Sequence, residues 1–168
     1  SLTLSAQSAV VALGGRLHWP QMALAPELPL KLNRPRHVMP SDRLLTTDGL
    51  KQANMLIAGA GNRRILILGG SHSAYAVAGA LLELPAAANL APGQIVILQR
   101  REPRIFYPDH NAAREDRYEV DIGDICPRTQ RVNRMGGLRG YGREMWRRIT
   151  ARPGILSEPR VVRRPLLN

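Results

Sequence analysis

The stretch RRILILGGSHSAYAVAGALLEL, residues 63–84, decides the fold because three different segments follow one another in it. Residues 65–68 are wholly apolar and include two isoleucines, which is typical of a strand buried on both faces. Gly69 and Gly70 interrupt this run, where the backbone can turn sharply or approach a ligand closely. Apolar residues then recur at helical spacing over 71–84. The order strand, glycine turn, helix predicts the first half of a nucleotide-binding βαβ unit.

A second strand of the same type follows at residues 94–98, QIVIL, after a connection long enough for a crossover. Gln99, Arg100 and Arg101 come next. In a dinucleotide fold this strand ends beside the adenosine ribose, where an acid favours a free 2′-hydroxyl and an arginine favours a 2′-phosphate. No acid is present and two arginines follow, so we predict NADPH rather than NADH, with Arg100 and Arg101 on the 2′-phosphate.

The glycine turn departs from the GxGxxG pattern. Gly69 fits the first position, Ser71 replaces the second glycine and Ala74 the third. The helix that starts here would present free backbone N–H groups and the positive end of its dipole to a pyrophosphate. His72 could contact a phosphate or face solvent. The predicted cofactor-binding residues of the turn are Gly69, Gly70, Ser71, His72 and Ser73.

Two other interpretations of the turn stay open. One is a plain structural turn of an α/β protein. The other is a nucleophile elbow, because Ser71 and Ser73 lie where a strand turns into a helix, as the serine of an α/β-hydrolase does. An elbow needs small residues around the serine, and Tyr75 occupies one such place when Ser73 is taken as the centre. We therefore favour nucleotide binding.

The segment LILGGSHSAYAVA resembles the NADPH-domain turn of the class B flavoprotein monooxygenases and related two-dinucleotide-domain flavoproteins, which often contain a strand, GGGHSA and a helix. Residues 8–15, SAVVALGG, are similar to the strand ending in Ala-Thr-Gly that closes the FAD domain of that family, with Leu13 where the threonine would stand. The resemblance covers roughly residues 8–98 and implies that Gly14 and Gly15 lie near FAD.

From the strand and helix pattern together with this resemblance we expect an α/β fold, with a Rossmann-like parallel sheet and helices on both faces. Residues 1–40 would be the end of an FAD-domain strand and a proline-rich crossover. Residues 41–168 would be an NAD(P)-binding domain with a long polar insertion over 100–135. The resemblance implies a fragment, because the glycine motif for the FAD pyrophosphate is not in this chain.

The resemblance also implies a function. NADPH would reduce FAD, and the reduced flavin would activate oxygen for substrate hydroxylation. The chain would be the NADPH-binding portion of a flavin-dependent, monooxygenase-like oxidoreductase, and FAD would require sequence from the remainder of a flavoprotein or from a partner chain. No acid–base residue is then required of this segment, because the cofactor carries the chemistry.

The formal net charge of +11 supports an alternative, a non-catalytic Rossmann-like scaffold subunit of a large, nucleic-acid-containing assembly. Only Lys31 and Lys51 of the 24 basic residues are lysines, and the bland explanation is a GC-rich genome. Residues 128–164 are strongly basic, whereas 109–124 hold six of the 13 acids. Nucleic acid is the less favoured partner, because an aromatic content of 4% leaves few stacking platforms.

Cys126 is the single cysteine, which excludes an internal disulfide and fits a reducing compartment, the cytoplasm or an organelle matrix. Its apolar neighbour suggests a buried structural thiol. The four histidines have no metal-ligand spacing, so we predict no metal site. No apolar run approaches the ~18 residues of a membrane span, so we expect no membrane partner.

The remaining expected elements follow from local patterns. We predict a helix over 44–58 capped by Thr46 or Thr47, and a loop over 86–93. Proline punctuates an extended connection at 16–40. Further expected elements are a strand at 8–13, a short helix at 111–117, a helix at 138–151 and a strand beginning at Val161.

Overall fold

The computed structural model describes residues 8–11 and 38–165. The chain divides into two compact units. We call the first, Ser1–Arg101 with Pro159–Asn168, the sheet unit, and the second, Glu102–Glu158, the arginine unit. The predicted positions Gly14 and Gly15, and most of the predicted connection at 16–40, lie outside the described residues.

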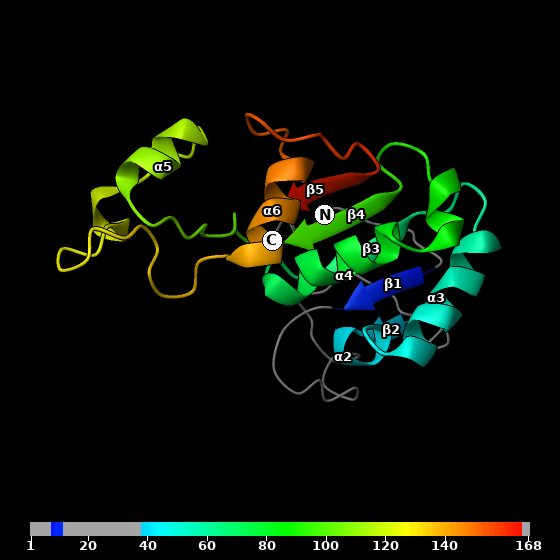
Figure 1. Ribbon diagram of the computed structural model, residues 1–168. Helices are drawn as coiled ribbons and strands as arrows, with labels where there is room; N and C mark the ends of the chain where they lie inside the picture. Colours follow the sequence, from blue (N-terminus) through cyan, green and yellow to red (C-terminus); the bar gives the residue numbers. More distant parts are fainter. Residues whose placement is uncertain (1–7, 12–37, 166–168) are drawn as a thin grey trace. The chain divides into compact units, whose positions relative to one another are not determined.

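Five parallel strands form one sheet in the sheet unit, in the order β2-β1-β3-β4-β5 (Figure 1). β3 and β4 are buried at every residue, as their continuous apolar sequences predict. Val11 pairs with Leu68 and Leu68 with Leu98, so three strands end at nearly the same level. The predicted parallel α/β fold is confirmed. The strands are β1 Ser8–Val11, β2 Val38–Pro40, β3 Ile65–Leu68, β4 Ile95–Gln99 and β5 Val161–Pro165.

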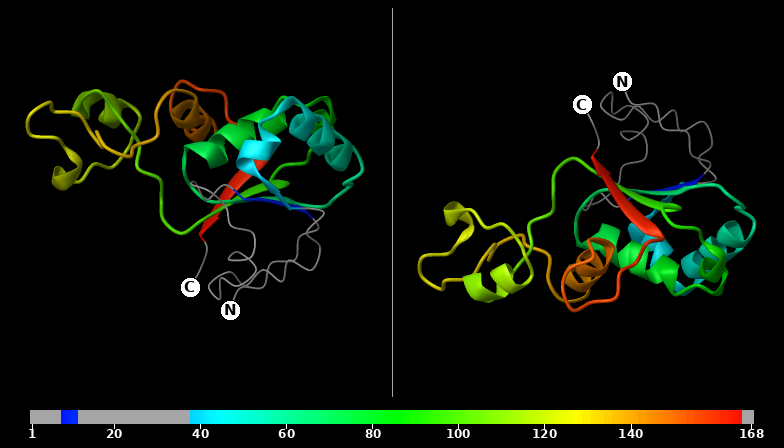
Figure 2. Two further views of the ribbon diagram at one scale, coloured as in Figure 1. Left: turned by 90° about the horizontal axis from the view of Figure 1, so that it is seen from below. Right: turned by 90° about the horizontal axis from the view of Figure 1, so that it is seen from above.

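The helices of the sheet unit that the structure describes lie along one side of the sheet (Figure 2). The connections from β2 to β3 and from β3 to β4 run in the same direction across the sheet, and right-handed crossovers then place both helices on one face. α4 packs against β3 and β4 and is buried along Tyr75, Val77, Ala78 and Leu81. These elements are α2 Ser41–Leu44, α3 Thr47–Ala58, α4 His72–Leu82 and η2 Pro85–Asn89.

The predicted start of α3 is confirmed. The Thr46 hydroxyl accepts a hydrogen bond of 3.1 Å from the Gly49 N–H, so Thr46 caps the helix and satisfies one of its first free donors. The prediction for 86–93 is wrong in part, because η2 winds through residues 86–89. Pro85 at the first position of this short helix suits its fixed φ and its missing N–H.

The prediction of a connection is wrong at residues 38–40, which form β2. β2 is an edge strand that pairs only with β1. A proline lacks the N–H that a central strand must donate, but Pro40 ends an edge strand, where no second neighbour needs that donor. The proline content of this segment therefore led us to predict a connection where the structure has a short edge strand.

The arginine unit holds α5 His110–Glu115, η3 Ile122–Asp124 and α6 Gly140–Ile149. Isolated bridges join Ile105 to Leu138, and Val132 to both Tyr107 and Ile125. The two predicted helices of this region are confirmed, each a little shorter than expected. Its buried apolar side chains are Ile105, Tyr107, Ala113, Val132, Leu138, Met145 and Trp146, and its buried polar ones are Asp116, Asn133 and Glu158.

Candidate functional site

The glycine turn lies at the carboxyl end of the parallel sheet, where the strand order reverses. From β1 the chain goes first to one edge of the sheet, through β2, and then to the other, through β3, β4 and β5. In open α/β sheets, ligands bind outside the carboxyl ends of the strands at such a reversal. The reversal falls between β1 and β3, and Gly69 is the first residue after β3.

Gly69 has a backbone φ of 121°, which L side chains rarely adopt. Its N–H donates a hydrogen bond of 2.8 Å to the carbonyl oxygen of Leu98, which ties the turn to the end of β4. A glycine is therefore required at the first position of the predicted motif for a conformational reason.

Gly70 is required for a different reason, which is close approach. A Cβ at this position would lie 2.9 Å from the Cβ of Gln99 and 3.7 Å from the carbonyl oxygen of Arg101. The backbone of the turn therefore packs directly against the end of β4 and the residues that follow it. This close packing fixes the position of the turn relative to the end of β4.

Ser71 is the N-cap residue of α4. Its side chain makes no capping hydrogen bond, and no acid lies in the first turn of the helix. Its carbonyl oxygen accepts the Ala74 N–H at 3.0 Å. The positive end of the α4 dipole therefore lies at the glycine turn. The first helical turn of α4 has no carboxylate that would compete with an anionic ligand there.

The structure brings the predicted turn and the predicted arginine pair together at the carboxyl end of the sheet. Ser71 and His72 are exposed, and Ser73 is half-buried. Arg100 and Arg101 are exposed directly after β4, whose last residue contacts Gly70. Sequence reasoning therefore identified two groups of residues that are neighbours in space.

Sequence reasoning missed other residues at the carboxyl end of the sheet. Arg164 in β5 pairs with Leu98 of β4, so a further arginine lies beside the end of the strand that leads to Arg100. The pattern VVRRP carried a strand signal and two arginines, but only the register shows which strand they adjoin. Tyr75 and Gln99 were also missed as partners, although the Tyr75 hydroxyl donates to Gln99 Oε1 at 3.3 Å.

The excess of positive charge lies in the sheet unit. This unit contains 13 of the 24 basic residues and only four of the 13 acids, whereas the arginine unit contains 11 basic residues and nine acids. The corresponding formal net charges are +9 and +2. Most of the basic segment 128–164 is therefore balanced by acids within its own unit.

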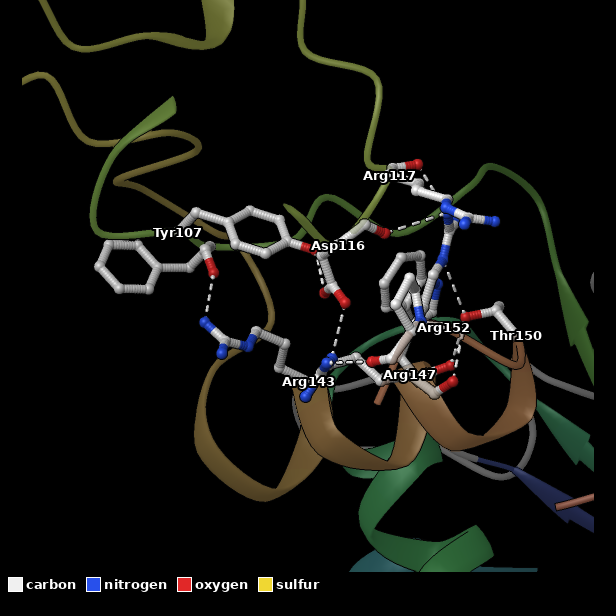
Figure 3. A network of polar contacts seen from close by, with 10 residues as sticks. Tyr107, Asp116, Arg117, Arg143, Arg147, Thr150 and Arg152 are labelled. Carbon is white, nitrogen blue, oxygen red and sulfur yellow. Dashed lines mark hydrogen bonds and ion pairs between the residues drawn. The ribbon is translucent and has the colours of Figure 1, made fainter. Parts of the chain in front are cut away.

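Several arginines of that segment have partners inside the arginine unit (Figure 3). Arg147 Nε lies 2.7 Å from Asp116 Oδ1, and Arg148 Nη2 lies 3.2 Å from Glu158 Oε2. Arg152 Nη1 donates to the carbonyl oxygen of Arg117 at 2.7 Å. These guanidinium groups therefore already have partners within their own unit.

Asp116 is the centre of this network. It is 4% exposed, and it also accepts a hydrogen bond of 2.6 Å from the Tyr107 hydroxyl. Burial, followed by this hydrogen bond and the charge of Asp116, raises the pKa of Tyr107 well above its usual value. Tyr107 therefore stays protonated and donates to the carboxylate. The arrangement is structural, since it satisfies a buried charge.

The expectation of a buried structural thiol at Cys126 is wrong. Cys126 is half-buried, and the Arg134 guanidinium approaches its sulfur at 3.9 Å. The Thr129 side chain, the Thr129 backbone and then Arg134 lower the pKa of the thiol from 9.0 to about 7. Its neighbours along the chain, Ile125 and Pro127, suggested an apolar site, but polar groups of Thr129 and Arg134 interact with its sulfur.

We predict that the alkylation rate of Cys126 by iodoacetamide rises with pH to half of its plateau near pH 7, because the thiolate is the nucleophile and the thiol pKa is about 7. Mass spectrometry of the modified peptide measures the rate. In Arg134→Ala the midpoint should move upward, since a guanidinium that favours the thiolate is gone. A midpoint near pH 9 in the unaltered chain would contradict the prediction.

Within residues 8–11 and 38–165, no group of three or more histidine, cysteine, aspartate or glutamate side chains is arranged to hold a metal ion. In the same part of the chain, none of the helices has both the length and the apolar character that crossing a membrane requires.

Comparison with known proteins gives one informative similarity. No family model matches the chain, and no solved structure matches it. The chain is similar to the CMP-5′-(3-aminopropyl)phosphonate hydroxylase of Streptomyces rubellomurinus, with 44% identity over 86 residues. The matched region is 51% of this chain and 20% of that hydroxylase, so the chain spans only a small part of the relative's length.

Proposed function

We propose that this chain is the NADPH-binding portion of a flavin-dependent oxidoreductase of the monooxygenase type, in which NADPH reduces FAD and the reduced flavin activates oxygen. The observation that carries the proposal is the position of the glycine turn and the arginine pair together at the carboxyl end of the sheet, where the strand order reverses. The similarity to a hydroxylase supports the same class of reaction.

The residues present fit NADPH. The backbone of Gly69 and Gly70 and the first turn of α4 would receive the pyrophosphate, because the turn follows β3 at the reversal of strand order and the helix end is positive. The hydroxyls of Ser71 and Ser73 lie on the same turn. Arg100 and Arg101 would take the 2′-phosphate, which separates NADPH from NADH. NADPH, when bound, supplies a hydride.

The role of the chain in this proposal is to bind and orient the nucleotide. FAD would be held by the remainder of a flavoprotein or by a partner chain, and the candidate positions for it in this chain, Gly14 and Gly15, lie outside the described residues. The substrate named for the relative belongs to that protein.

The arginine pair gives the proposal its test. We expect Arg100→Ala with Arg101→Ala to weaken NADPH binding at least tenfold and to leave NADH nearly unchanged, because only NADPH loses charge-assisted hydrogen bonds of about 1.5–3 kcal/mol each. Isothermal titration calorimetry at low salt measures both dissociation constants. Low salt matters because both arginines are exposed and are screened by ions.

Arg63→Ala with Arg64→Ala is the matched control. Both residues are exposed, and they precede β3, so they lie at the opposite end of the sheet from the glycine turn. This variant loses the same charge and should bind NADPH like the unaltered chain. Equal losses for NADPH and NADH in the first variant, or equal losses of NADPH in both variants, would contradict the assignment.

A further inference from the structure

Tyr75 and Gln99 form a buried hydrogen-bonded pair next to the glycine turn. Tyr75 is 0% exposed and Gln99 is 4% exposed. The Tyr75 hydroxyl donates to Gln99 Oε1 at 3.3 Å, which joins the first turn of α4 to the last residue of β4. Polar groups removed from water need partners, and this pair satisfies part of that need internally.

Both members of the pair also contact the turn. The backbone of Gly70 packs against Gln99, since a Cβ on Gly70 would lie 2.9 Å from Gln99 Cβ and 3.2 Å from its Oε1. The Tyr75 N–H donates to the Ser71 carbonyl oxygen at 3.4 Å. The turn is therefore held on one side by Gln99 and on the other by the helix that carries Tyr75.

We propose that Tyr75 and Gln99 are positioning residues that hold the turn over 69–71 in the shape that receives a phosphate. They touch the turn but not the reacting atoms, and they act by restricting its backbone. A loop already fixed in its binding shape loses less conformational freedom when a ligand arrives, so binding is tighter. The role in nucleotide binding rests on the proposed function, whereas the restriction of the turn does not.

A glutamine suits this position for an electrostatic reason. Its amide oxygen accepts from the Tyr75 hydroxyl without bringing a negative charge to the edge of an anion site. Glutamate has the same shape and offers the same acceptor, but at 4% exposure its charge would be buried behind Gly70. Gln99→Glu therefore keeps the length and the acceptor of the side chain, and adds a negative charge at a pH high enough to ionise a buried carboxyl.

The restriction of the turn is tested by hydrogen exchange of the Gly69 N–H, measured by NMR on the full chain. In Tyr75→Phe we expect this amide to exchange about tenfold faster, because one buried hydrogen bond that braces the turn is lost. Amides of α3 should keep their rates. Tyr141→Phe is the control, since it removes a hydroxyl from an exposed tyrosine in the arginine unit. If Tyr75→Phe does not fold, Gln99→Met removes the same acceptor.

The consequence for binding is tested by calorimetry with NADPH and NADH. We expect Tyr75→Phe to weaken both nucleotides by a similar factor of about five to ten, through a less ordered turn. We expect Gln99→Glu, titrated at a pH high enough to ionise the buried carboxyl, to weaken NADPH more than NADH, because a carboxylate repels the cofactor that carries an additional phosphate. A purely structural role would lower the melting temperature and leave both dissociation constants unchanged in the folded protein.

The outcomes separate the two proposals. Unchanged Gly69 exchange in a folded Tyr75→Phe variant would overturn the positioning role, whether or not nucleotide binds. Faster exchange with unchanged affinity for both nucleotides would overturn the link to binding. A third outcome is faster Gly69 exchange in Tyr75→Phe together with no binding of either nucleotide by the unaltered chain. This outcome would support the restriction of the turn and overturn the proposed function instead.

Discussion

Asp116→Ala is expected to destabilise the arginine unit by about 3 kcal/mol, a large effect for one substitution. Asp116 is buried and receives Arg147 Nε at 2.7 Å and the Tyr107 hydroxyl at 2.6 Å. Without the carboxylate, the Arg147 guanidinium loses its charged partner and keeps the Pro153 carbonyl oxygen, and the buried Tyr107 hydroxyl loses its acceptor. Breaking a buried ion pair from one side costs about 3–5 kcal/mol, and the partial exposure of the Arg147 side chain, 26%, places this case at the lower end.

Urea unfolding followed by tryptophan fluorescence measures this effect, because Trp146 is buried in the arginine unit and its ring lies 5.9 Å from that of Tyr118. Asp121→Ala is the control, since Asp121 is an exposed acid of the same unit. Its transition should stay within the experimental error of the unaltered chain. Equal midpoints for the Asp116 and Asp121 variants would show that the network contributes nothing.

Gly69→Val is expected to abolish dinucleotide binding, with a loss of at least about a hundredfold in affinity, since a strained backbone of about 1–3 kcal/mol combines with a blocked phosphate approach. Gly69 has a φ of 121°, which a β-branched residue resists. The turn must then change its backbone conformation or keep its shape under strain.

The comparison for this variant is Gly123→Val. Gly123 is an exposed glycine of the arginine unit, and a Cβ there meets nothing within 4 Å. Calorimetry with NADPH should show binding by Gly123→Val and none by Gly69→Val, with circular dichroism confirming that both are folded. A folded Gly69→Val protein that keeps its affinity would mean that the turn is structural.

Most strands and helices of the sheet unit were predictable from sequence because each is specified locally. Residues 65–68 form β3 because a short run of β-branched and aliphatic side chains fits a strand covered on both faces. Thr46 and Asp48 mark the start of α3 by capping and by charge. β2 was not predictable, because an edge position that tolerates Pro40 is a property of the assembled sheet.

The candidate site was predictable to the same extent. The glycine turn directly follows β3, and Arg100 and Arg101 directly follow β4. These two parallel strands end at the same level, so the order of residues in the sequence was sufficient to predict that the two groups are neighbours. Tyr75 and Gln99 are 24 residues apart, and their hydrogen bond depends on how α4 packs on β4. Arg147 of the basic segment 128–164 likewise pairs with Asp116, which is 31 residues away. This contact neutralises one of the charges of the segment, and the sequence alone does not reveal it.

The central claim is that this chain binds NADPH at the turn after β3, and a calorimetric titration of the full, unaltered chain tests it most directly. NADPH and NADH are titrated separately at the same ionic strength. We predict saturable binding of NADPH with an affinity at least about tenfold higher than that of NADH, since one charge-assisted hydrogen bond to the 2′-phosphate already contributes that much. Absence of binding by both nucleotides, or equal affinity for the two, would contradict the claim.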